Sequence, residues 1–191
     1  VHVNNLVRRA HADKDIKLVF RAIPPEALTT FAASDASQAN ASNHGTQGGY
    51  VLFFAHRDLY EGRTSDLSPV AWKSYRLRRA SGATLCSETQ ACKDAVGHLC
   101  WLNNMLLEAV DPSYDIKKRQ EAMLRRPTGV VVDCKSLFDH VCARASVSAG
   151  ISDRFTSIDL TILRQALQEC GCSVRWSPGH LQIADDLTKD Q

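Results

Sequence analysis

The sequence predicts an α/β fold built on a mixed β-sheet. Three predicted strands separated by short turns open the domain, which favours an antiparallel meander. Two later strands are separated by helices, which favours parallel crossovers in the same sheet. The 191 residues suffice for one such domain, or at most for two small ones. One domain is therefore expected.

Residues 1–25 are expected to form a leading helix and a linker, followed by a domain over residues 26–191. Apolar side chains recur at helical spacing over residues 3–12 among basic residues. The pattern stops before Pro24 and Pro25, which cannot continue a helix. The chain begins at Val1 and not at Met, as a piece of a longer polypeptide would, although an expression boundary would look the same.

Three strands are expected in the first half of the domain. Residues 28–34 are apolar and small and lead into the polar stretch 37–49, so they predict a strand followed by a loop. Residues 50–54 are a continuous apolar run that predicts a buried strand. A third strand opens at residues 70–72, after turn signals at Glu61-Gly62 and Ser68-Pro69.

A long helix is expected over residues 85–110, where apolar side chains recur at intervals of three, four and seven until Asp111-Pro112 stops the run. Residues 111–128 form a charged insertion, which predicts a solvated helix or a mobile loop. The β-branched run 130–132 then predicts a strand buried on both faces of the sheet.

The C-terminal part is expected to contain helices on either side of one more strand. Helical spacing resumes at Leu137 and again over residues 158–167, with Gly171 placed to end the second helix. Residues 172–176 predict the last strand. Residues 183–189 could form a short terminal helix.

The composition indicates an ordinary folded domain without a membrane partner. The 23 basic and 21 acidic residues leave a net charge of +2, so any surface for nucleic acid must be local. No apolar run approaches the roughly 20 residues that span a bilayer, and the N-terminus lacks the apolar region of a secretion signal. Three tryptophans, Trp72, Trp101 and Trp176, are expected in the core.

The seven cysteines are an odd number and contain no Cys-x-x-Cys pair, which argues against a disulfide framework and against a zinc knuckle. A reducing, intracellular compartment fits best. A zinc cluster of Cys134, His140 and Cys142 lacks the usual ligand spacing, so a buried thiol is favoured at Cys134.

Three acidic residues stand where the predicted architecture would bring them together. Asp35 follows the first strand, Asp133 follows the fourth, and Glu88 lies in the first turns of the long helix. If the first and fourth strands are parallel neighbours, their carboxyl ends meet and the two aspartates face each other. Carboxylate oxygens are the ligands that hold Mg²⁺ for phosphodiester hydrolysis. A fourth acid could come from Asp185 or Asp186.

Each of these acids also has an ordinary structural explanation. Asp35 could be a turn residue, Glu88 a favourable charge at a helix N-terminus, and Asp133 a helix cap. Their joint placement at strand ends favours the metal site.

Six short motifs in order give the chain a resemblance to a known family. They are Ser34-Asp35-Ala36-Ser37, Gln47-Gly48-Gly49-Tyr50, Val70-Ala71-Trp72-Lys73-Ser74, Ser87-Glu88-Thr89-Gln90-Ala91, Val132-Asp133-Cys134-Lys135-Ser136-Leu137 and Ile183-Ala184-Asp185-Asp186-Leu187-Thr188-Lys189. Over about residues 28–190 the chain resembles the ribonuclease H domain of copia-type LTR retrotransposon polyproteins.

The resemblance implies a fold, an activity and a context. The fold is a five-stranded mixed sheet in the order 3-2-1-4-5 with helices on both faces. The activity is cleavage of the RNA strand of an RNA–DNA hybrid with two Mg²⁺ ions, for which Mn²⁺ may substitute. The context is a polyprotein in which residues 1–25 lead in from an upstream reverse transcriptase. The cytoplasm, a virus-like particle and the nucleus are all compatible locations.

The resemblance also assigns the site residues. The metal ligands are Asp35, Glu88, Asp133 and Asp185, with Asp186 as the alternate for the last. His180 resembles the flexible-loop histidine of cellular ribonucleases H, which assists proton transfer or product release. An exposed histidine after a turn is equally often a plain surface residue.

Two sets of residues are expected to contact the substrate. Four cations just ahead of Glu88 could lie along phosphates of the hybrid, or could simply protect an edge strand from pairing: Lys73, Arg76, Arg78 and Arg79. Polar side chains in the loop after Asp35 could donate to ribose 2′-hydroxyls, although polar residues are common in any loop: Asn40, Ser42, Asn43 and Gln47.

Two other functions remain open at this stage. The chain could be a catalytically inactive or domesticated module that binds nucleic acid or braces a reverse transcriptase, although the presence of all four acids counts against this. It could also be another nuclease or an integrase of the same superfamily, because the fold alone does not decide the substrate.

Overall fold

The central strand of the sheet is β1 (Leu28–Ala41), and its pairing on both sides sets the topology. It pairs antiparallel with β2 (Gly45–His56) on one side and parallel with β4 (Thr128–Val132) on the other. The outer strands are β3 (Leu67–Arg76), antiparallel to β2, and β5 (Cys172–Trp176), parallel to β4. The computed structural model describes residues 2–41, 45–79, 82–143 and 150–189.

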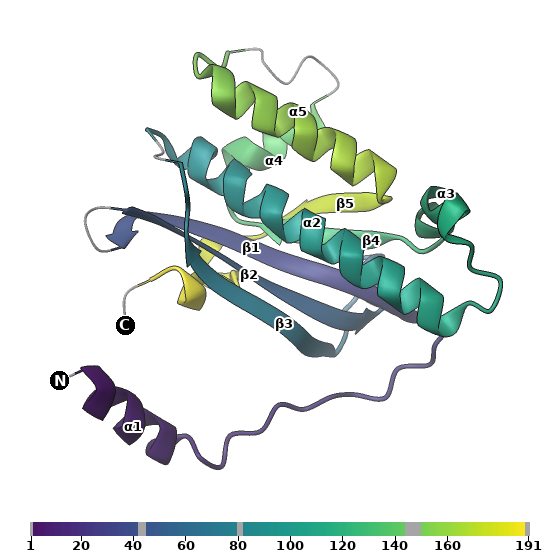
Figure 1. The fold of residues 1–191 in the computed structure, drawn as a ribbon, viewed down its shortest axis with the longest axis horizontal. Coiled ribbons are helices and arrows are strands. Elements are labelled where there is room, and N and C mark those ends of the chain that lie inside the picture. The colour runs from purple at the N-terminus through teal and green to yellow at the C-terminus, as the bar shows by residue number, and fades with distance from the viewer. Residues whose placement is uncertain (1, 42–44, 80–81, 144–149, 190–191) are drawn as a thin grey trace.

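The sheet confirms the predicted fold class. It has five strands of mixed direction in the order β3-β2-β1-β4-β5 (Figure 1). The remaining elements are α1 (His2–Ala12), η2 (Arg57–Leu59), α2 (Thr84–Val110), η3 (Ile116–Lys118), α3 (Arg119–Arg125), α4 (Lys135–Cys142), α5 (Arg154–Glu169), η4 (Gly179–Leu181) and η5 (Asp185–Leu187), where η denotes a 3₁₀ helix.

The two faces of the sheet are covered differently. Helices α2, α4 and α5 pack on one face and form the main core, in which Leu99, Leu137, Leu160 and Val130 are completely buried. The other face of β1 and β2 carries a smaller apolar cluster, which is completed by Ala184 and Leu187 of the C-terminal segment. The predicted terminal helix over residues 183–189 is thus only the single 3₁₀ turn η5.

The first two strands are longer than expected, and the predicted loop over residues 37–49 is wrong. Among the described residues of this stretch, β1 runs to Ala41 and β2 begins at Gly45. The two strands form an antiparallel ladder in which Ser37 faces Gln47 and Asp35 faces Gly49. The glycine there serves packing and not a turn, because a Cβ on Gly49 would lie 2.8 Å from the Cβ of Leu187. Gly49 is therefore explained by its close contact with the C-terminal segment.

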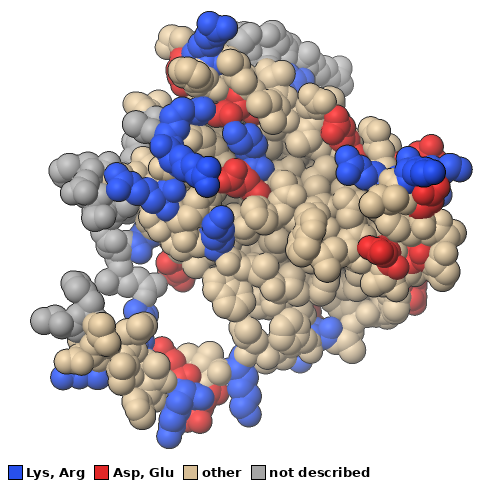
Figure 2. Space-filling view, viewed as in Figure 1, with Lys and Arg blue, Asp and Glu red and all other residues tan. Residues whose placement is uncertain are grey.

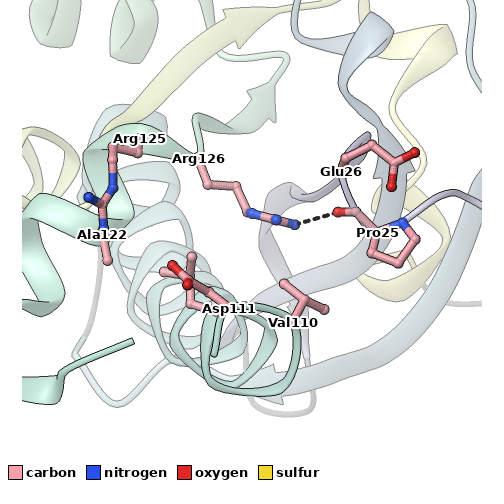
Figure 3. A pocket seen from close by; sticks show the side chains of 8 residues that line it. Pro25, Glu26, Val110, Asp111, Ala122, Arg125 and Arg126 are labelled. Atoms are coloured by element: carbon pink, nitrogen blue, oxygen red, sulfur yellow. Dashed lines mark hydrogen bonds between the residues drawn. The ribbon is translucent and has the colours of Figure 1, made fainter. Parts of the chain in front are cut away.

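The charged insertion over residues 111–128 also differs from its prediction. It contains α3, whose Ala122 and Met123 are buried in the main core, and its last residue, Thr128, begins β4. Arg126 donates to the carbonyl oxygens of Leu28 at 2.6 Å and Pro25 at 3.2 Å, across a cavity beside the end of α2 (Figure 3). The insertion is therefore packed against the domain.

The predictions for the later helices are largely confirmed. Helix α2 ends at Val110 as expected, and strand β5 spans the predicted residues. Gly171 follows α5 with φ at +59°, the left-handed conformation that glycine adopts most readily. No helix within the described residues is long and apolar enough to cross a membrane.

The tryptophans and one cysteine pair contradict the sequence predictions. Trp72, Trp101 and Trp176 are 56%, 62% and 44% exposed, so none belongs to the core. Cys100 of α2 and Cys170 at the end of α5 form a disulfide, with their Cα atoms 6.0 Å apart. An odd cysteine count and the absence of a short motif do not exclude one pair that is 70 residues apart in sequence.

The leading helix α1 lies apart from the sheet (Figure 1). The extended segment after it contacts the start of β3, where the Arg21 amide donates to Ser68 Oγ at 3.0 Å. The Arg21 side chain also lies 3.9 Å from the Asp66 carboxylate. The apolar side chains of α1 are exposed, so this helix contributes nothing to the core.

The ion pairs of Asp159 predict a pH-dependent stability. Burial raises the pKa of Asp159, but bonds from Lys93 (2.7 Å) and Arg79 outweigh burial and hold the pKa below its ordinary value. This stabilisation is present above the unfolded pKa of about 3.9 and is lost as the pH falls through the folded pKa. We expect Asp159→Asn to lower the free energy of unfolding by about 2 kcal/mol at pH 7, less than for a fully buried pair because both cations are partly exposed.

Urea unfolding at pH 7 and pH 3 measures this effect. The difference in the free energy of unfolding between Asp159→Asn and the parent should be smaller at pH 3. Asp139→Asn is the control, because Asp139 is exposed and its ion pair is with Lys135, one helical turn away on the same helix. It should change the free energy of unfolding by less than about 0.5 kcal/mol. Equal stability of Asp159→Asn and parent at pH 7 would contradict the prediction.

The Cys100–Cys170 disulfide predicts a second stability effect. Closing a loop of 70 residues restricts the unfolded chain and should contribute about 4 kcal/mol. Cys170→Ser should lower the urea midpoint by the corresponding amount, and a thiol reductant should do the same to the parent. Cys142→Ser, which removes an exposed free thiol, serves as the control and should have little effect.

Candidate metal centre

Three carboxylates from distant parts of the chain meet at one end of the sheet. Asp35 lies on β1, Asp133 follows the last residue of β4, and Glu88 lies in the second turn of α2. Strands β1 and β4 are parallel and pair as far as Ala33 and Val131, so Asp35, inside β1, and Asp133 each lie two residues beyond the last pair, and α2 packs over β1. One carboxylate oxygen from each residue lies within 4.8 Å of the others. The predicted convergence of these three residues is therefore present in the structure.

The cluster is largely withdrawn from solvent. Asp35 is 4% exposed and Glu88 is 3% exposed, whereas Asp133 is half-buried. Glu88 Oε2 is buried and has no hydrogen-bond partner among the described residues. A buried polar atom without a partner is costly, and a buried carboxylate more so. No positively charged side chain among the described residues therefore forms a hydrogen bond with this oxygen.

The pKa shifts in the cluster also indicate that a compensating positive charge is missing. Burial, followed by the charges of Asp35 and Asp133, raises the pKa of Glu88 to about 9. The pKa of Asp35 is raised by burial and by the charges of Asp133 and Asp185. Burial and the Asp185 charge also raise the pKa of Asp133. A hard divalent cation would relieve this repulsion, and three carboxylates are the donor set that Mg²⁺ prefers, so the residues fit such an ion.

The fourth predicted acid lies close to the cluster without joining it. Asp185 is half-buried in η5, near enough that its charge affects Asp35 and Asp133, but the described group within 4.8 Å contains only the three residues above. Its Oδ2 accepts a bond from Lys189 Nζ. Asp186 is exposed. Of the two adjacent acids, Asp185 is thus the one whose charge affects the pKa values of Asp35 and Asp133.

The turn that carries His180 borders the cluster. It forms η4, directly after β5, and a Cβ on Gly179 would lie 3.2 Å from Asp133 Oδ2. The His180 side chain itself is exposed. The structure therefore places this histidine beside the candidate site and open to solvent.

The predicted phosphate contacts divide into two groups. Lys73 and Arg76 lie exposed on the edge strand β3, and Arg78 is exposed just after it. Arg79 instead binds the buried carboxylate of Asp159. Figure 2 shows Lys and Arg side chains gathered, with some acids among them, over the region where β3 ends and α2 begins.

Of the predicted contacts to ribose, the two described residues, Asn40 and Gln47, lie on strands. Gln47 lies on β2, and its Nε2 donates to Ser74 Oγ on β3 at 2.7 Å. Asn40 falls near the end of β1. Ser42 and Asn43 lie outside the described residues.

Two residues beside the cluster were not singled out from the sequence. Thr188 Oγ1 donates to Asp35 Oδ2 in the buried interior. Trp176 Nε1 donates to the backbone oxygen of Asp133 at 2.9 Å. Thr188 belongs to the motif that also contains Asp185, so its position in that motif was the available signal.

Comparison with known proteins supports the fold and leaves the family open. No protein-family model matches the chain, and no curated protein matches it. Ribonuclease H1 from the halophilic archaeon Halobacterium salinarum NRC-1 is a structural neighbour, with a TM-score of 0.50, 16% identity, and coverage of 83% of this chain and 93% of that one.

A second neighbour is LC11 ribonuclease H1, isolated from compost by a metagenomic approach. Its structure gives a TM-score of 0.53 at 9% identity and covers 83% of this chain and 91% of that chain. The same LC11 enzyme in complex with an RNA/DNA hybrid gives a TM-score of 0.50 at 10% identity, covering 83% and 93% of the two chains. Sheet order, strand directions and these likenesses together show that the chain has a ribonuclease H-like fold.

Proposed function

We propose that this chain is a metal-dependent endoribonuclease that hydrolyses the RNA strand of RNA–DNA hybrids during retroelement reverse transcription. The observation that carries the proposal is the buried group of Asp35, Glu88 and Asp133 just beyond the paired residues of β1 and β4, with Glu88 Oε2 unpartnered among the described residues. The hybrid bound to the LC11 enzyme, a protein of the same fold, supports the substrate class.

The proposed metal ligands are the three clustered carboxylates, with Asp185 as a fourth and Asp186 as the less favoured alternate. When bound, two Mg²⁺ ions, or Mn²⁺ in their place, supply charge neutralisation at the phosphodiester and a lower pKa for the attacking water. The protein contributes rigid placement, because Asp35 and Asp133 are fixed by adjacent strands and Glu88 by a long helix packed on them. Burial also excludes competing water from Asp35 and Glu88.

The proposed substrate surface uses the exposed cations of the edge strand. Lys73, Arg76 and Arg78 are placed to meet phosphates of the hybrid, which supply most of the affinity in nucleic-acid binding. We assign Arg79 to the ion pair with Asp159. Contacts of Asn40, Ser42 and Gln47 with ribose 2′-hydroxyls remain part of the proposal.

His180 and the N-terminal residues complete the proposal. An exposed imidazole on the turn beside Asp133 suits proton transfer or product release, because an imidazole can both accept and donate a proton. Residues 1–25, with α1 lying apart from the sheet, suit a connection from a reverse transcriptase in the same polyprotein.

Cleavage assays with different nucleic acids and with site variants test the proposed function. The purified chain should cleave the RNA of a labelled hybrid with Mg²⁺, leave duplex RNA and duplex DNA intact, and do nothing with a chelator. Asp35→Asn and Glu88→Gln should each lower the cleavage rate by at least about 1000-fold, because each removes a ligand for the ion that stabilises the developing charge. Circular dichroism should show both variants folded.

Asp139→Asn, which changes an exposed acid on α4, is the matched control and should cleave normally. Full activity of Asp35→Asn would refute the site. A parent chain that binds the hybrid without cleaving it would favour the inactive module instead.

Metal binding should also stabilise the fold. A ligand at ten times its Kd adds about 1.4 kcal/mol to the free energy of unfolding, so Mg²⁺ should raise the melting temperature above that in NaCl of equal ionic strength. In chelator, Glu88→Gln should melt at or above the parent temperature, because it removes an acid whose ionised form is disfavoured by burial and by the charges of Asp35 and Asp133. The same variant should lose most of the Mg²⁺-dependent increase; a shift as large as that of the parent would contradict the assignment of Glu88.

A further inference from the structure

We propose that Thr188 is a positioning residue for Asp35 and that its hydroxyl is required for tight binding of a divalent cation at the carboxylate cluster. The inference rests on the proposed metal centre. Its basis is one buried contact, in which Thr188 Oγ1 donates to Asp35 Oδ2 from a segment 153 residues away in sequence.

The hydroxyl is well placed to act on this carboxylate. Thr188 is buried, so water does not compete for the bond. Its Oγ1 also lies 3.0 Å from the backbone oxygen of Asp185, but an ionised carboxylate is the stronger acceptor for the single hydroxyl proton. A bond to one carboxylate oxygen fixes the plane of the group and leaves the second oxygen for a cation.

The bond also restricts the orientation of the ligand. Loss of the Thr188 hydroxyl would leave the Asp35 carboxylate free to rotate. Groups that orient a metal ligand in this way typically account for 10- to 100-fold in metal affinity.

The surrounding contacts fix Thr188 independently of Asp35. Ser37 Oγ donates to the Thr188 carbonyl oxygen at 2.5 Å, and Ser74 Oγ donates to that of Leu187 at 2.5 Å. The approach depends on Gly49, the strand partner of Asp35, where a Cβ would lie 3.0 Å from Thr188 Cγ2. The backbone of the segment and the hydroxyl of Thr188 can therefore be perturbed separately.

The test compares two changes of Thr188 with a change of its anchor. Calorimetric titration of the full chain with Mn²⁺ at pH 7 measures the affinity without reference to activity. Thr188→Val keeps the shape and removes the donor, and we expect it to weaken binding about 10-fold. Thr188→Ser keeps the donor and should bind within about threefold of the parent. Ser37→Ala loosens the backbone anchor and should also stay within about threefold.

The same variants separate affinity from turnover on the hybrid. Thr188→Val should need about 10-fold more Mg²⁺ for half-maximal cleavage, and saturating Mg²⁺ should restore most of the rate. Thr188→Ala, which also lacks the hydroxyl, replaces the valine variant if the latter does not fold.

Three outcomes would overturn the inference. These are parental Mn²⁺ affinity in Thr188→Val, a loss in Thr188→Ser as large as that in Thr188→Val, and an equal loss in Ser37→Ala. If the parent binds Mn²⁺ but cleaves no hybrid, the proposed nuclease function fails while the order of affinities still decides the role of Thr188. If the parent binds no divalent ion, the metal centre and this inference fail together.

Discussion

The main constraint on this fold is that it must hold three buried carboxylates together against their mutual repulsion. Asp35, Glu88 and Asp133 are brought within 4.8 Å of one another, although two of them are almost fully buried and none has a cationic partner within the group. A fold gains nothing from such an arrangement in the absence of a cation, because desolvation and like charge both oppose it. The sheet and the long helix supply the free energy that holds it together. Strained polar clusters of this kind are characteristic of sites where function, and not stability, has set the residues.

The C-terminal segment is the second element that shapes the site. It covers the face of the sheet opposite the helices, placing Ala184 in a small apolar cluster and Asp185 beside the carboxylates. Gln182 extends this attachment, since its Nε2 donates to the Ser34 carbonyl oxygen at 3.0 Å, one residue before Asp35. A segment without an α-helix is thus held in place by bonds between side chains and backbone oxygens, given by Gln182 to a strand and by Ser37 and Ser74 to the segment. The candidate site is assembled from both faces of the sheet.

Sequence reasoning succeeded where a local rule determined the structure. The convergence of Asp35 and Asp133 follows from the parallel pairing of β1 and β4, although β1 continues past Asp35, and the long helix follows from its apolar period. The strand order came from the resemblance to a family and not from the pattern of residues. The sequence reasoning failed where contacts between distant segments overrode local composition. Gly49 suggested a loop because its tight contact with Leu187 is visible only in three dimensions.

The same limit explains the other errors. Trp72 lies on an edge strand, where the alternating pattern does not say which face is covered. Met123 is one of only two buried residues in a short charged helix, too few to produce a recognisable period. The Cys100–Cys170 pair joins two helices that only the folded chain brings together. Thr188 could not be assigned a role from the sequence, because its role depends on a hydrogen bond to Asp35, and that contact is visible only in the folded structure.

The bond from the Trp176 indole to the backbone oxygen of Asp133 has a practical consequence. The indole is partly exposed and donates to a residue of the carboxylate cluster, so we expect its ultraviolet emission to respond to a change of charge there. If a cation binds the cluster, Trp176 would then act as a natural optical reporter of that event, with no dye attached.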